Sequence, residues 1–104
     1  MKQKLRVWHI PQIATTDATF YIPVETLEEG KKIMDLLACY DLFQFENRIK
    51  PYYTNANGLQ VYNEDSTEWE NWYSEECKDV EEYLETNDKV QSFRKELFIQ
   101  LKKN

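Results

Sequence analysis

The side chains that could carry out nucleophilic or acid–base chemistry are few in this sequence. His9, the one histidine, lies between Trp8 and Ile10 in a segment of alternating polarity, where a structural histidine is more usual than a catalytic base. Cys39 follows apolar residues and is expected to be a small buried side chain, whereas Cys77 lies among carboxylates. No serine or cysteine near His9 in sequence has the setting of an activated nucleophile. We therefore expect that the protein is not an enzyme.

Metal and cofactor sites need residue patterns that the sequence lacks. One histidine and two cysteines are too few for a self-contained zinc finger or a disulfide framework. Two glycines exclude a glycine-rich phosphate loop. The acidic residues around 63–66 do not follow the alternating ligand spacing of an EF-hand loop. We expect no bound metal and no cofactor.

Carboxylates are abundant, and they are concentrated in one segment of the chain. The 104 residues carry a net charge of −6. Residues 63–88 hold eleven acidic side chains against Lys78 alone, whereas residues 1–62 are neutral and residues 89–104 carry a net +4. Such a segment can be a solvated face that keeps the protein soluble, a surface that docks a basic protein, or a divalent-cation site. The acidic total argues against direct binding of nucleic acid.

Aromatic residues are interleaved with these carboxylates. Trp69 and Trp72 are three residues apart, so in a regular strand they point to opposite faces, one toward the core and one toward solvent. An exposed tryptophan ringed by carboxylates is typical of interface hot spots, although both rings could instead pack in the core. The partner would be a protein with a basic surface. The residues expected to bind it are Trp69, Trp72, Tyr73, Glu75, Glu76, Glu81, Glu82 and Glu85.

The elements that must position these residues begin with two short strands. Residues 5–10 alternate apolar and polar side chains, as a half-buried strand does. Residues 18–22 form a second β-rich run, which Pro23 is expected to end. The two runs predict a hairpin, and the prolines predict a sheet edge.

A helix is expected after this hairpin. Thr26 and Glu29 fit a capping box, and apolar residues then recur at helical spacing. We expect the helix to end near Tyr40 or Asp41. Residues 42–47 alternate in polarity again and predict a short strand or an extended connector.

The second half of the chain predicts another hairpin and two helices. Asn57-Gly58 is the strongest local turn signal. Two strands are expected at residues 58–62 and 67–73, joined by a loop at 63–66. Two helices are expected at residues 79–84 and 88–101.

Together these elements predict the α+β class, with a small antiparallel sheet of two hairpins packed by one central helix and two C-terminal helices. The length fits a single domain over residues 1–104, which contains the acidic segment 63–88 and a basic C-terminal helix at 89–104. Nothing in the sequence is typical of a signal peptide or a membrane span, so the expected location is the cytoplasm.

Several segments resemble one family of small acidic proteins. They are residues 4–12, 40–47 and 49–51, Asn55, Gly58-Leu59, and the Trp69-x-x-Trp72-Tyr73 pattern. With this spacing the chain resembles the phage and prophage proteins of Gram-positive bacteria that are often labelled superinfection exclusion proteins. The resemblance covers most of residues 4–73. It implies a protein made in a bacterial host during infection or lysogeny that acts by binding another macromolecule.

The hypothesis that follows is a phage or prophage accessory protein that binds and inhibits a host or competing-phage macromolecule. Its contact surface would be acidic and aromatic, and it would mimic nucleic acid if the target groove normally holds DNA or RNA. The alternative is a structural or self-assembling phage protein without inhibitory function. In that case the basic helix at 89–104 would pair with the acidic segment of a neighbouring copy, forming a homo-oligomer.

Overall fold

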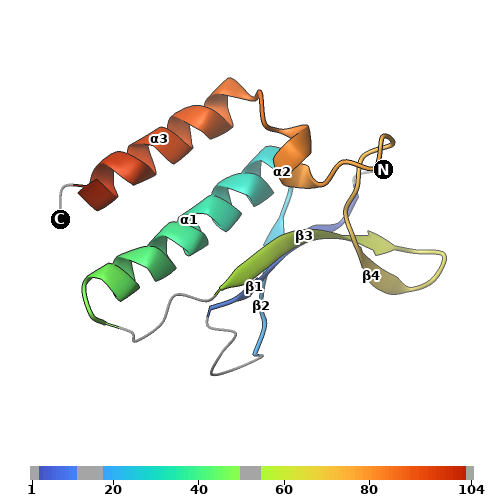
Figure 1. The fold of residues 1–104 in the computed structure, drawn as a ribbon. Helices are drawn as coiled ribbons and strands as arrows, with labels where there is room; N and C mark the ends of the chain where they lie inside the picture. The colour runs from blue at the N-terminus through green and yellow to red at the C-terminus, as the bar shows by residue number, and fades with distance from the viewer. Residues whose placement is uncertain (1–2, 12–17, 50–54, 103–104) are drawn as a thin grey trace.

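The computed structural model describes residues 3–11, 18–49 and 55–102 (Figure 1). Its four strands form one antiparallel sheet in the order β2-β1-β3-β4, and α1 packs on one face of that sheet with α2 and α3 on the same side. This arrangement confirms the predicted α+β class with two hairpins and three helices. The elements are β1 Leu5–Ile10, β2 Phe20–Val24, α1 Leu27–Glu46, β3 Ala56–Asn63, β4 Glu68–Asn71, α2 Val80–Tyr83 and α3 Asp88–Lys102.

Strand β1 lies in the middle of the sheet and shows the predicted alternation. Leu5, Val7 and His9 are buried toward the helices, and the residues between them are half-buried on the other face. Strand β2 pairs with β1 as the predicted hairpin. The prediction that Pro23 ends this strand is wrong, since β2 continues to Val24. Because β2 is an edge strand, proline leaves no hydrogen bond missing on its solvent side.

Helix α1 begins as predicted. The Thr26 hydroxyl accepts a hydrogen bond from the Glu29 backbone N–H at 3.0 Å. The predicted end near Tyr40 or Asp41 is wrong, because the helix continues to Glu46, and most of the strand or connector expected at 42–47 is its last turns. Tertiary packing explains the difference, because α1 packs beside α3. The local polarity pattern does not reveal this contact between the two helices.

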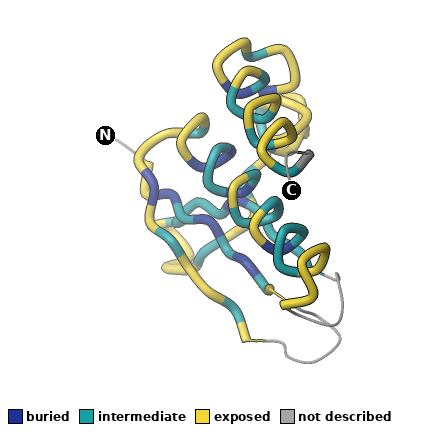
Figure 2. The backbone as a smooth tube through the Cα atoms, turned by 90° about the vertical axis from the view of Figure 1, so that its left-hand side faces the viewer, coloured by how far each residue is buried: buried dark blue, intermediate teal, exposed yellow. Residues whose placement is uncertain are grey.

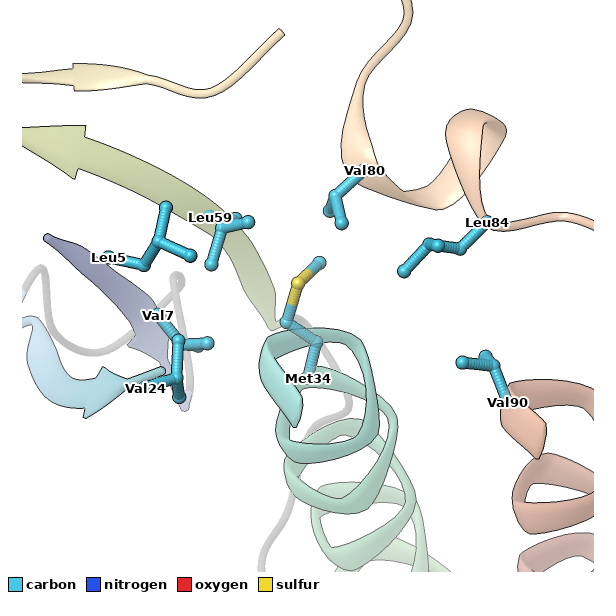
Figure 3. Packing of buried hydrophobic residues seen from close by; sticks show 8 residues of the cluster. All are labelled: Leu5, Val7, Val24, Met34, Leu59, Val80, Leu84 and Val90. Carbon is cyan, nitrogen blue, oxygen red and sulfur yellow. The ribbon is translucent and has the colours of Figure 1, made fainter. Parts of the chain in front are cut away.

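Close packing of α1 on the sheet depends on Gly30. A Cβ atom at this position would lie 2.8 Å from Leu59 Cδ1 and 3.4 Å from Val24 Cγ2. Figure 3 shows the core that forms around this crossing, with side chains from the strands, α1, α2 and the start of α3. Its buried members are Leu5, Val7, Val24, Met34, Leu59, Val80, Leu84 and Val90.

The turn predicted at Asn57-Gly58 is also wrong, because both residues lie within β3 and pair with His9 and Trp8 of β1. The glycine is needed here for packing. A Cβ on Gly58 would lie 2.6 Å from Trp8 Nε1, so the indole lies against the bare backbone of β3. The predicted hairpin between β3 and β4 is present, with a β4 shorter than expected.

The two C-terminal helices form where they were predicted. Asp79 caps α2 by accepting the Glu82 backbone N–H at 2.9 Å. Helix α3 then packs against α1 with Val90 fully buried. The tube in Figure 2 shows that burial is concentrated where the helices meet the sheet, whereas much of α3 is exposed.

Candidate partner-binding surface

Trp72 and Tyr83 contact each other where the acidic segment leaves the sheet. The Trp72 N–H donates to the Leu59 carbonyl at 2.9 Å, which extends the β3–β4 pairing by one bond beyond the strand. The Trp72 ring packs against the core and meets Tyr83 of α2 edge-on, with 5.4 Å between ring centroids. Tyr83 is itself 51% exposed and Tyr73 is 58% exposed. The pair therefore joins the core to a surface of exposed tyrosines.

A tight turn after these residues presents two carboxylates. The Ser74 N–H donates to the Lys78 carbonyl at 2.8 Å, and Cys77 takes a positive φ of 63° to close the turn. Glu75 and Glu76 are exposed at its tip. An open hollow of about 580 Å³, here called the acidic hollow, is lined by Gln3, Trp72, Tyr73, Ser74, Glu75, Glu76, Lys78 and Tyr83.

The basic residue in this hollow does little to neutralise it. Lys78 Nζ lies 3.4 Å from Glu76 Oε2, and both side chains are largely exposed. An exposed pair of this kind contributes about 0–1 kcal/mol. Since Lys78 is the one basic side chain among residues 63–88, the formal charge of this segment remains strongly negative.

Glu81 differs from the other carboxylates because it is tied to the helices. Its Oε1 lies 3.4 Å from Lys31 Nζ and 3.6 Å from Arg94 Nη2. The Lys31 side chain is only 3% exposed and also bonds Asp35 at 2.6 Å. Glu81 therefore helps to compensate a buried ammonium group and joins α2 to α1 and α3. Glu81 is nonetheless exposed, as are Glu82 and Glu85.

The two tryptophans lie on opposite faces of the sheet, as predicted. Trp69 points away from the helices, where the Arg6 guanidinium carbon lies 4.2 Å from its ring centroid. Of the eight residues predicted to bind a partner, the structure brings Trp72, Tyr73, Glu75 and Glu76 around the acidic hollow. Glu82 and Glu85 lie on the exposed side of the neighbouring segment, and Glu81 and Trp69 are engaged elsewhere.

Sequence reasoning missed part of this surface. Tyr83 lines the acidic hollow and packs against Trp72, and Gln3 reaches it from the start of the described chain. The sequence could have indicated Tyr83, since it is an aromatic residue inside the predicted acidic helix. No local sequence pattern indicates Gln3, because its position follows from the pairing of β1 with β3 rather than from its neighbours in sequence.

The histidine belongs to a buried polar network between the sheet and α1. His9 Nε2 lies 2.7 Å from Asp41 Oδ2, and both side chains are about 5% exposed or less. A carboxylate can only accept, so Nε2 donates and Nδ1 accepts from the Asn57 amide at 3.2 Å. Asn55 also donates to Asp41 at 2.9 Å. His9 does not line the acidic hollow, and its burial in this network agrees with the structural role expected for it, which stays a prediction.

Within residues 3–11, 18–49 and 55–102, no three His, Cys, Asp or Glu side chains are grouped to hold a metal ion. In the same ranges no helix has the length and apolar character needed to cross a membrane. Cys39 is half-buried, and burial, with a smaller contribution from Asp35, raises the pKa of its thiol against an opposing effect of Arg94.

Comparison with known proteins places the chain in a family. A family model described as superinfection exclusion gene product 17 matches residues 4–89. The chain is 48% identical to the superinfection exclusion protein of Salmonella phage P22, in an alignment that covers 80% of this chain and 91% of the relative. No solved structure matches it. Since Salmonella is Gram-negative, the family extends beyond the phages of Gram-positive bacteria named with the sequence resemblance. The chain belongs to the superinfection exclusion gene product 17 family.

Proposed function

We propose that this superinfection exclusion protein acts by binding and inhibiting a host or competing-phage macromolecule through the surface around the acidic hollow. The observation that carries the proposal is the placement of exposed Tyr73 and Tyr83 beside Glu75 and Glu76, within a segment of net charge −10. Exposed tyrosines with a polar rim are typical of binding hot spots.

The two kinds of side chain would have different functions. The carboxylates raise the rate of encounter with a basic partner and fix its orientation. The tyrosines supply contact area that loses water on binding, and Trp72 behind Tyr83 fixes that ring in place. If the basic groove of the partner normally holds DNA or RNA, the same surface would inhibit it by mimicry.

Charge reversal tests this proposal with a matched control. Glu75→Lys/Glu82→Lys changes the net charge by +4 at exposed sites of the proposed surface, and Glu46→Lys/Glu96→Lys makes the same change at exposed sites of α1 and α3. Glu81 is left intact because a lysine there would face buried Lys31.

Partners are first captured from host lysate with the wild-type protein, identified by mass spectrometry, and then titrated with each variant at 50 and 300 mM salt. We expect the first variant to weaken binding at least about tenfold at low salt, the control to retain it, and wild-type binding to fall with salt. Binding that is independent of salt, or equal for the two variants, would contradict the proposal.

A second function, self-assembly, is favoured by a separate observation. Large apolar side chains are exposed on the α1–α3 side of the molecule, where Leu36 is 48%, Tyr40 57%, Phe98 48% and Ile99 53% exposed. Light scattering over a range of protein concentration, at low and high salt, separates the two functions. A monomer at every concentration contradicts self-assembly. An oligomer that persists in high salt favours contact through these apolar side chains, whereas one that dissociates in salt favours pairing of basic and acidic segments.

A further inference from the structure

The sheet has one face that none of the helices covers. Helix α1 packs on the inner face, where Leu5, Val7 and Leu59 are buried, and α2 and α3 lie on the same side of the sheet and pack against α1 (Figures 1 and 2). The antiparallel register places the alternate residues on the outer face. Those that form a continuous cluster there are Arg6 and Trp8 of β1, Tyr21 of β2, Gln60 and Tyr62 of β3, and Trp69 of β4.

Aromatic rings and cations alternate across this outer face. The Arg6 guanidinium carbon lies 3.8 Å from the Tyr21 ring centroid and 4.2 Å from that of Trp69, so it is stacked between the two rings. Its Nε donates to Gln60 Oε1 at 2.8 Å, and this hydrogen bond holds the guanidinium between the two rings. At the next position along the sheet, Lys4 Nζ lies 5.3 Å from the Tyr62 ring centroid.

The charge of the outer face is opposite to that of the whole protein. None of the outward positions of the four strands is aspartate or glutamate, and Lys4 and Arg6 bring two positive charges. The carboxylates of β4 are at Glu68 and Glu70, on the inward positions of that strand. The net charge of −6, which argued against a nucleic-acid ligand, therefore does not describe this face.

We propose that the outer face of the sheet binds single-stranded nucleic acid, with bases on the aromatic rings and phosphates at Lys4 and Arg6. The combination of planar side chains and cations fits a ligand that is both aromatic and anionic. Four-stranded sheets with exposed aromatics stack two or three unpaired bases in this manner. A duplex hides its base faces, and two cations neutralise too few phosphates to hold it. This surface is independent of the one proposed above for a protein partner.

The test is a fluorescence anisotropy titration of the full chain with labelled 15-nucleotide dT and rU strands at 50 and 200 mM salt. Two phosphate contacts predict that the affinity falls by roughly sevenfold between these concentrations. Lys4→Gln should remove one contact and so reduce the slope of log affinity against log salt concentration by about half. Tyr21→Ala should weaken binding at least about fivefold, and Tyr21→Phe should restore it because the ring is kept.

Tyr83→Ala is the matched control, since Tyr21 and Tyr83 are 46% and 51% exposed on different surfaces. Circular dichroism confirms that each variant is folded. The proposal is overturned if no strand binds below about 1 mM, if the two tyrosine variants weaken binding equally, or if a 15-base-pair duplex binds as well as the single strand. Displacement of the strand by polyglutamate at the same charge concentration would show that the face binds acidic peptides instead.

Discussion

Replacing Asp41 by alanine tests whether the buried polar network holds the second half of α1 on the sheet. The substitution removes the carboxylate oxygen that lies 2.7 Å from His9 Nε2 and 2.9 Å from the Asn55 amide. Both donors then lose this acceptor, and the imidazole remains at a site where the residue is only 3% exposed. Alanine itself is a good helix former, so any destabilisation comes from the lost contacts rather than from the helix.

The size of the effect follows from the burial of the pair. A buried donor without its partner costs about 1–3 kcal/mol, and Asp41→Ala leaves two such donors, on His9 and Asn55. The gain in helix propensity offsets about 0.7 kcal/mol of this cost at most. We therefore expect the free energy of unfolding to fall by about 3 kcal/mol, a large part of the roughly 5–15 kcal/mol that a small domain has.

Urea denaturation followed by tryptophan fluorescence measures this change. Glu46→Ala is the control, because Glu46 lies on the same helix and is exposed, and its substitution should change the stability by less than about 0.5 kcal/mol. If the stability of Asp41→Ala lies within 0.5 kcal/mol of the wild type, the network does not hold α1 to the sheet and the structural role of His9 is refuted.

Three further substitutions or reactions probe other parts of the fold. Gly30→Ala should destabilise by about 1 kcal/mol, because overpacking against buried Leu59 exceeds the helix gain of roughly 0.5–1 kcal/mol; a more stable variant in thermal denaturation would contradict the close crossing. Thr26→Ala should cost about 1 kcal/mol through the lost cap, and an unchanged melting temperature would show that the capping bond does not form. With a thiol reagent at pH 8, exposed Cys77 should react rapidly and Cys39 more slowly, because burial raises the pKa of Cys39 and lowers its thiolate fraction; equal rates would contradict this burial.

Local signals predicted the elements that depend on local chemistry. The alternation of β1, the capping box at Thr26 and the hairpin between β3 and β4 are all present. Each depends on residues close in sequence, such as an N-cap and the backbone N–H three positions later. The division of Trp69 and Trp72 between the two sheet faces could be predicted for the same reason, since it needs only the period of a strand.

The errors arose where distant segments decide the local structure. Helix α1 ends with Arg48 at a positive φ of 60° and a hydrogen bond from the Ile49 N–H to the Gln44 carbonyl at 2.7 Å, so the usual glycine signal for a helix end is missing. The Asn57-Gly58 pair predicts a turn, yet the Asn57 amide is used by His9 and by the Met34 carbonyl. These contacts join residues more than twenty positions apart, which no local pattern reports.

The candidate surface was predictable in composition but not in arrangement. The density of carboxylates in residues 63–88 and the aromatics among them are visible in the sequence. The engagement of Glu81 with Lys31 and Arg94 is not, because it needs α1, α2 and α3 to meet. The outer face was missed for a similar reason, since Arg6, Tyr21 and Trp69 come from three strands spread over more than sixty residues.

The most direct measurement of how this protein acts is the plating efficiency of an infecting phage on host cells that make it. Cells would carry the wild-type protein, Glu75→Lys/Glu82→Lys or the control Glu46→Lys/Glu96→Lys, at equal protein levels. If the surface around the acidic hollow binds the target, the wild type and the control reduce plaque formation and the first variant loses most of that reduction. Exclusion by Glu75→Lys/Glu82→Lys that equals the wild type would contradict the proposed mechanism.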